Sequence, residues 1–305
     1  MSHRPNFSEE ATPGVFLGLD TTLDSSRVVM LPVPYEGTVS YRSGTRHGPR
    51  AIIEASAHLE LYDPELDAEP FQLGIHTAKP IWPDYSAPEH MIHKVSLRCR
   101  EYLHQNKFVV LLGGEHSVTV GAVQAYVEKY PDMSVLQLDA HADLRDRYHH
   151  TRWGHASTMR RIGELCPAMA VGIRSLSLEE MDHVREGNLK VMFVHKILTD
   201  PEWISKVLES LSDQVYVTID LDVLDQGIMP SVGTPVPGGL SWNQILDLLR
   251  RVAAEREVVG FDVVELAPIP GQVAPDFLAA KIVYKFLGCV FANKRLVSKN
   301  LKGQA

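Results

Sequence analysis

The chain has 305 residues, of which 45% are hydrophobic, so it can bury a substantial core and is not intrinsically disordered. Its 30 Lys and Arg against 38 Asp and Glu give a formal charge of -8, which disfavours nucleic acid and anionic membranes as partners. Three widely spaced cysteines, without a CxxC pair, exclude a disulfide framework and a thiolate zinc ribbon, and they fit a reducing compartment. Fourteen histidines, several of them beside aspartates, favour metal ions or small cations as ligands.

The polar ends of the chain contrast with the apolar pattern between them. Residues 1–13 lack the apolar stretch of a signal peptide, and no segment approaches the ~18 apolar residues that span a bilayer. We therefore expect a cytoplasmic protein that forms one domain over residues 1–305. Within it we expect a flexible segment at 1–13 and a tail at 293–305.

Short apolar, β-branched runs recur along the chain and predict buried strands. These runs cover residues 27–33, 108–112, 133–138, 168–173, 190–194, 215–221 and 258–264. Apolar residues at helical spacing predict helices at residues 89–105, 117–130, 202–211, 241–255 and 274–291. Ser241 and Gln244 have the spacing of a capping box. This alternation predicts an α/β protein with a mainly parallel sheet covered by helices on both sides.

Ionisable residues directly follow four of the predicted strands. The segments are Gly-Gly-Glu-His-Ser at 113–117, Asp-Ala-His-Ala-Asp at 139–143, Asp-Leu-Asp at 220–222, and Glu265. Since ligands bind at the carboxyl ends of parallel strands, we expect these side chains to meet in one site.

The composition of this predicted site points to metal ions. It contains four carboxylates and two imidazoles, namely Asp139, Asp143, Asp220, Asp222, His116 and His141. No Lys or Arg within the two aspartate motifs balances the charge, so divalent cations are the simplest neutralising partner. Six ligands are suited to two ions that share bridging carboxylates. Oxygen and nitrogen donors favour Mn²⁺, Mg²⁺ or Fe²⁺, and two-metal sites activate water for attack.

These motifs resemble the signatures of the ureohydrolases, that is, agmatinases and arginases, and most of all agmatinase. Thr-Pro-Val-Pro-Gly-Gly at 234–239 and the segment at 37–49 add to the resemblance, which runs from roughly residue 29 to residue 291. The resemblance implies an arginase-like three-layer α/β/α fold, two Mn²⁺ ions per chain, and a homo-oligomer, either a trimer or a hexamer.

The resemblance also implies a role for each site residue. His116 and Asp143 would bind one ion, His141 and Asp222 the other, and Asp139 and Asp220 would bridge both. His155 would be the proton-shuttling histidine, although Ala156 and Ser157 follow it where relatives often have Gly-Thr. Glu265 would receive the substrate guanidinium, because a carboxylate pairs bidentately with that planar cation.

The implied reaction is hydrolysis of a small cationic guanidino compound to urea and a primary amine. A metal-bridging hydroxide would attack the guanidinium carbon, and Asp143 would carry its proton to the departing amine. Agmatine, which yields putrescine, is the favoured substrate; guanidinobutyrate, aminopropylagmatine and arginine are alternatives.

The tail of the substrate is left open by the sequence. An ammonium tail would suit Asp146 or Glu115 at the pocket mouth, whereas a carboxylate tail would suit Arg145, Arg147 or Arg152. A second enzyme class is a mononuclear-zinc amide hydrolase like the deacetylases. A catalytically inactive binding protein is disfavoured, because all six ligands are present.

Overall fold

The computed structural model describes residues 12–187 and 189–302, with residues 293–302 described by their backbone alone. Its strands are β1 (Val28–Val33), β2 (Ile75–Thr77), β3 (Phe108–Gly113), β4 (Ser134–Leu138), β5 (Ala168–Ile173), β6 (Lys190–Phe193), β7 (Gln214–Asp220) and β8 (Glu257–Val264). In this described part of the chain they form one sheet of 8 strands in the order β2-β1-β3-β8-β7-β4-β5-β6. Every neighbouring pair is parallel, as the near-continuous apolar runs predict.

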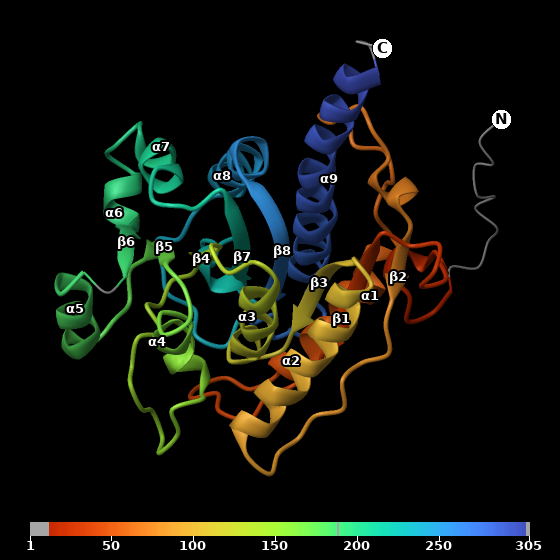
Figure 1. Cartoon of the computed structure of the whole chain (residues 1–305). Coiled ribbons are helices and arrows are strands. Elements are labelled where there is room, and N and C mark those ends of the chain that lie inside the picture. Colours follow the sequence, from red (N-terminus) through yellow and green to blue (C-terminus); the bar gives the residue numbers. More distant parts are fainter. Residues whose placement is uncertain (1–11, 188, 303–305) are drawn as a thin grey trace.

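Helices cover both faces of the sheet (Figure 1). They are α1 (Gly48–Ser56), α2 (Pro88–His104), α3 (Val118–Lys129), α4 (Thr158–Ile162), α5 (Leu178–Arg185), α6 (Val194–Ile197), α7 (Trp203–Leu208), α8 (Trp242–Glu255) and α9 (Ala274–Lys302). Apolar residues of α1, α7, α8 and α9 pack on one face, and those of α2, α3 and α4 pack on the other. The expected three-layer α/β/α fold is therefore confirmed.

The alternation of side chains along each strand divides the core between the two faces. Val28 and Met30 of β1 belong to one apolar cluster, whereas Val29 and Leu31 belong to the other. Successive residues of a strand point to opposite faces, so a strand covered on both sides must be apolar throughout. All six residues of β1 and of β3 are buried.

The seven predicted strands and five predicted helices are present, with small shifts at their ends. The capping box of α8 is confirmed, because the Ser241 hydroxyl accepts the Gln244 backbone N–H and the Gln244 side chain accepts the Ser241 N–H. The sequence did not predict β2, which has three residues, nor α1, α4, α5 and α6. Helix α9 continues through Lys302 beyond the predicted end at residue 291.

Of the predicted terminal segments, residues 1–11 and 303–305 lie outside the described residues. Cys99, Cys166 and Cys289 are buried free thiols, in agreement with the predicted absence of a disulfide framework. Among the described residues, no helix combines the length and apolarity needed to cross a membrane.

Candidate metal centre and active site

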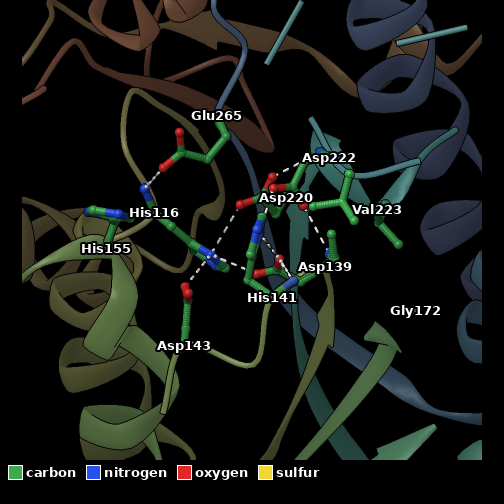
Figure 2. Close-up of polar contacts among 12 residues, drawn as sticks. His116, Asp139, His141, Asp143, His155, Gly172, Asp220, Asp222, Val223 and Glu265 are labelled. Atoms are coloured by element: carbon green, nitrogen blue, oxygen red, sulfur yellow. Dashed lines mark hydrogen bonds and ion pairs between the residues drawn. The ribbon is translucent and has the colours of Figure 1, made fainter. Parts of the chain in front are cut away.

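The strand order explains why the four ionisable segments meet. Strands β3, β8, β7 and β4 are consecutive in the sheet, and all point the same way. Their carboxyl ends therefore deliver residues 113–117, Glu265, residues 220–222 and residues 139–143 to adjacent positions. Figure 2 shows the side chains of the predicted ligands facing one small volume at this edge. The predicted convergence at one edge of the sheet is thus confirmed.

The loop after β3 approaches the neighbouring backbone closely. A Cβ atom on Gly114 would collide with the carbonyl oxygen of Tyr35, so only glycine fits at this position. The Gly114 carbonyl accepts the backbone N–H of Glu265 at 2.8 Å, which ties the end of β8 to this loop. In return, Oε1 of Glu265 accepts the backbone N–H of His116 at 2.6 Å. Glu265 is thereby fixed beside the first predicted ligand.

Two site residues have strained backbones. Asp143 has φ 52° and Glu265 has φ 67°, the left-handed region that L side chains rarely adopt. Such strain costs of order 1–3 kcal/mol per residue and concentrates at functional sites, where the surrounding structure enforces it.

Three of the aspartates use one oxygen to fix their own orientation. Oδ1 of Asp139 accepts the N–H of His141 at 2.6 Å, and Oδ1 of Asp220 accepts the N–H of Asp222 at 2.9 Å. Oδ1 of Asp222 accepts the N–H of Ala140 at 2.9 Å, which joins the β7 motif to the β4 motif. In Asp220 and Asp222, Oδ2 faces the centre, 3.4 Å from Nδ1 of His116 and 2.8 Å from Nδ1 of His141, respectively.

Three carboxylate oxygens surround Nδ1 of His116. The distances are 3.1 Å to Asp139 Oδ2, 3.1 Å to Asp143 Oδ2 and 3.4 Å to Asp220 Oδ2. His116 is 1% exposed, so water does not separate these groups from one another.

The other ring nitrogen of His116 determines where its proton lies. Nε2 is 2.9 Å from Oγ1 of Thr218, whose own hydroxyl donates to Asp262 at 2.6 Å. Because the Thr218 proton is already committed, Nε2 of His116 must donate, and Nδ1 of the neutral ring keeps its lone pair. Nδ1 is indeed a buried nitrogen with no hydrogen-bond partner among the described residues. A lone pair that faces three carboxylates requires a cation between them, which is what a metal ion provides.

A second donor group adjoins the first. Nδ1 of His141 lies 2.8 Å from Oδ2 of Asp222 and 3.6 Å from Oδ1 of Asp139. Two sets of three potential ligand atoms each lie within 4.8 Å of one another: His116, Asp139 and Asp220 form one set, and Asp139, His141 and Asp222 the other. Asp139 belongs to both sets, which agrees with the bridging role that the resemblance implies. The donor types fit hard divalent cations.

The pKa values of the same side chains report how strongly this centre attracts positive charge. Burial and the neighbouring Asp139 raise the pKa of Asp143 to about 7. Burial, followed by the Asp222 and Asp139 charges, raises the pKa of Asp220 well above its usual range. Burial alone would lower the pKa of His141, but Asp222 and Asp139 raise it to about 12. Without a metal ion, protons must neutralise the site.

A cavity of about 260 Å³ opens onto the centre and has an acidic wall. Its lining carboxylates are Asp143, Glu180, Asp220, Asp222 and Glu265. Among the described lining residues, Arg145 carries the one guanidinium, which stacks 4.9 Å from the ring centroid of Tyr148 and lies 3.9 Å from a Glu180 oxygen. The cavity therefore suits a cation.

His155 lines this cavity from the loop before α4. Its Nδ1 is 3.2 Å from Oγ1 of Thr38, and its Nε2 is 3.4 Å from Oγ of Ser40. Burial is the largest influence on His155 and lowers its pKa to about 4. The ring is therefore neutral near pH 7, with one nitrogen free to accept a proton.

Two sequence-based expectations about the pocket mouth are wrong. Glu115 is 0% exposed and lies behind the cavity wall, where Gly37 and Thr38 donate to it. Asp146 accepts hydrogen bonds from Arg161 at 2.7 Å and Arg152 at 3.3 Å and does not line the cavity. Neither carboxylate is placed to receive the tail of a substrate.

The sequence also missed two residues that shape the site. Glu180 lines the cavity and accepts the backbone N–H of Leu144, directly after Asp143, at 3.0 Å. Arg174 donates to the carbonyl of Asp222 at 2.7 Å and to that of Val236 at 2.8 Å, which holds the loop after β7 in place. The signal for Glu180 is the Ser-x-x-Glu spacing at 177–180; Arg174 follows β5 with no comparable motif.

Comparisons with known proteins agree with this geometry. The Arginase family model matches residues 26–289. N(1)-aminopropylagmatine ureohydrolase of Synechocystis sp. is 40% identical over 296 residues, which cover 94% of this chain and 96% of that protein. Agmatinase of Bacillus cereus is 34% identical over 268 residues, which cover 86% of this chain and 91% of that protein. The solved structure of proclavaminate amidino hydrolase from Streptomyces clavuligerus matches with a TM-score of 0.86 at 28% identity, covering 93% of this chain and 99% of that one.

The parallel sheet with an acidic donor cluster at its carboxyl edge, together with these matches, defines a hydrolase of C–N bonds in amidines. The chain belongs to the arginase family. This chain is an arginase-family ureohydrolase, and its His and Asp donor cluster suits metal binding.

Proposed function

We propose that this chain hydrolyses N1-aminopropylagmatine to urea and spermidine, with agmatine as the second candidate substrate. The relative named for aminopropylagmatine is 40% identical, whereas the relative named agmatinase is 34% identical. Both substrates combine a guanidinium with a cationic tail. The sequence motifs favour agmatine, whereas the identities to these relatives favour the longer polyamine.

The acidic cavity wall carries the proposal. Five carboxylates line the cavity. Asp143, Asp220 and Asp222 would bind the ions and Glu265 the guanidinium, which leaves Glu180, 3.9 Å from the Arg145 guanidinium, for a cationic tail. A substrate with a carboxylate tail, such as guanidinobutyrate or arginine, would bring a negative charge to this wall. A polyamine tail brings positive charge, which Glu180 would attract.

We propose that two Mn²⁺ ions per chain occupy the donor sets around His116 and His141. The remaining ligands would be the four aspartates of the two motifs, with Asp139 shared. When bound, ions of this kind lower the pKa of water and so supply a hydroxide nucleophile at neutral pH. A mononuclear-zinc deacetylase-like reaction has less support, because two donor sets that share Asp139 suit a pair of ions.

Glu265 would bind and orient the guanidinium. Its Oε1 is held by the His116 N–H, which leaves Oε2 and a further lone pair for the two parallel N–H donors of a guanidinium. Fixing the guanidinium plane in this way presents its central carbon to the nucleophile.

Asp143 and His155 would move the protons. Asp143 would accept the proton of the attacking water and pass it to the nitrogen of the departing amine. His155 would exchange a proton between that amine and solvent through Nε2, since its ring is neutral near pH 7.

We also propose a cytoplasmic homo-oligomer, a trimer or a hexamer as the resemblance implies. Light scattering after gel filtration would measure its mass.

A panel of substrates tests the proposed function. Urea release is measured for the Mn²⁺-loaded protein with N1-aminopropylagmatine, agmatine, guanidinobutyrate and arginine. We expect the highest kcat/KM for N1-aminopropylagmatine, followed by agmatine. A higher kcat/KM for guanidinobutyrate or arginine would contradict the argument from the acidic wall.

A further inference from the structure

A threonine from a distant part of the chain, Thr38, holds His155 in place. The Thr38 hydroxyl oxygen contacts this residue twice: it accepts the backbone N–H of His155 at 3.0 Å and lies 3.2 Å from Nδ1 of the ring. The backbone contact fixes the position of the histidine, and the ring contact fixes its orientation. Whether Thr38 donates a hydrogen bond to Nδ1 or accepts one from it depends on where the single hydroxyl proton of Thr38 points.

Glu115 determines the direction of that proton. Its Oε1 is 2.8 Å from the Thr38 hydroxyl and also accepts the Ser117 hydroxyl. Its Oε2 accepts the backbone N–H groups of Gly37 at 2.6 Å and Thr38 at 2.7 Å. Backbone amides are donors only, so Oε2 must be an acceptor. The carboxylate is fully buried, and these four donors satisfy its charge.

The Thr38 proton is therefore committed to Glu115, and the Thr38 oxygen faces His155 as an acceptor. Nδ1 of His155 must then donate. In a neutral ring this leaves the lone pair on Nε2, the nitrogen that lies next to Ser40.

We infer that Glu115 and Thr38 are positioning residues that fix the Nδ1–H tautomer of His155 and so reserve Nε2 for proton exchange at the reacting amine. This inference rests on the proposed function, in which His155 moves a proton. Glu115, the buried glutamate of Gly-Gly-Glu-His-Ser, would thus orient His155, whereas the adjacent His116 would bind a metal ion. A carboxylate that orients a catalytic imidazole through its Nδ1–H is a known physical arrangement in hydrolases, although here a threonine hydroxyl stands between the two.

A pair of variants at Thr38 isolates the hydroxyl. Thr38→Val keeps the shape of the side chain but removes the acceptor for Nδ1, whereas Thr38→Ser keeps the hydroxyl. We expect kcat to fall about 10- to 100-fold in Thr38→Val, the range typical of groups that orient a reacting side chain, with KM and bound metal unchanged. Thr38→Ser should restore most of the lost kcat.

Glu115→Gln tests the direction of the hydrogen bonds. The amide oxygen of the introduced glutamine would still accept the two backbone N–H groups, so its NH₂ would face Thr38 and donate to the hydroxyl. The Thr38 proton would then turn toward Nδ1 and favour the opposite tautomer, Nε2–H. Proton–nitrogen correlation spectra of ¹⁵N-histidine-labelled protein, loaded with diamagnetic Mg²⁺, report the tautomer directly. His155→Gln identifies the signal.

We expect the wild type to show Nδ1–H at His155, and Glu115→Gln to show Nε2–H together with a lower kcat. An Nε2–H ring in the wild type, or an unchanged tautomer and full kcat in both Thr38→Val and Glu115→Gln, would overturn the inference. These spectra do not require turnover. A wild type that releases no urea would therefore refute the proposed function while the tautomer still tests the positioning.

Discussion

Oδ2 of Asp222, at the end of β7, lies 2.8 Å from Nδ1 of His141, at the end of β4. This contact joins two segments that are 81 positions apart in the chain but whose strands are neighbours in the sheet. The sheet order therefore brings the ligands together, and the loops supply only their final orientation.

The number of metal ions lost with a ligand should depend on whether that ligand belongs to one donor set or to both. Asp139 belongs to both sets and His141 to one. We therefore predict that Asp139→Asn retains almost no metal, whereas His141→Asn retains about one ion per chain of the expected two. Elemental analysis after dialysis measures this. The exposed His150→Asn is the matched control and should bind as the wild type does. Equal metal loss in both site variants would contradict the shared role of Asp139.

Glu265→Gln should separate substrate binding from metal binding. The glutamine still accepts the His116 N–H but leaves the substrate cation without a charged partner in a buried site, which costs about 3–5 kcal/mol. We expect kcat/KM to fall at least about 100-fold while both ions remain bound, since each tenfold loss corresponds to about 1.4 kcal/mol. Loss of metal in parallel with activity would instead make Glu265 part of the metal centre.

Gly172→Ala should destabilise the fold near the centre. Gly172 has φ +96°, and a Cβ atom there would lie 2.7 Å from Cγ2 of Val223 and 3.0 Å from the carbonyl oxygen of Asp139. Figure 2 places Gly172 and Val223 beside this aspartate. Backbone strain and overpacking together predict a loss of about 2–4 kcal/mol in unfolding free energy.

The matched control for this variant is Gly271→Ala. Gly271 has φ +84°, but a Cβ atom added there would meet no described atom within 4 Å, so strain alone applies and the loss should be about 1 kcal/mol. Urea denaturation measures both variants. Equal losses would mean that contact with Val223 and Asp139 has no effect.

A buried ion pair between α9 and the segment before β2 predicts a pH-dependent stability. Lys285 Nζ lies 2.8 Å from Oδ1 of Asp63, and both side chains are at most 5% exposed. Burial alone would raise the pKa of Asp63, but Lys285 and two backbone N–H groups hold it below its ordinary value. A lowered folded-state pKa stabilises the protein above the ordinary pKa, and this contribution is lost as the pH falls through the folded value.

Lys285→Met leaves the Asp63 carboxylate buried without its partner. We predict a loss of about 3–5 kcal/mol in unfolding free energy at pH 7. The difference from the wild type should narrow as the pH falls below the ordinary aspartate pKa of about 3.9, because Asp63 becomes protonated first in the variant and, at lower pH, in the wild type. The double variant Asp63→Asn/Lys285→Met should recover much of the loss. A difference that is constant with pH would contradict this assignment.

The hydrophobic pattern predicts most of the fold. Runs such as 108–112 and 258–264 are apolar throughout because both faces of their strands are covered, and the structure has β3 and β8 there. Strand β2 escapes prediction because Ile75 is its one apolar residue among three. Helix α1 follows a segment whose glycines and prolines indicate a loop, and its short apolar face became evident only against α9.

The sequence likewise predicts some residues of the candidate site and not others. Local spacing indicates residues such as Asp139 and His141, because their positions two apart after a strand already place them together. Contacts between distant segments leave no such pattern: Thr218 supports His116 from 102 positions away, and Thr38 contacts His155 from 117 positions away. Glu115 shows the same difficulty: its charge predicts a carboxylate exposed to substrate, whereas its backbone donors Gly37 and Thr38 lie in a loop 78 and 77 positions earlier.

A metal titration followed by urea release tests most directly whether the chain is a two-metal ureohydrolase. Metal-free protein receives increasing Mn²⁺, and urea is measured with N1-aminopropylagmatine and with agmatine as substrates. We expect that activity requires the metal and reaches its plateau at about two ions per chain, as two donor sets predict. A plateau at one ion per chain, or no urea from either substrate at any metal content, would contradict it.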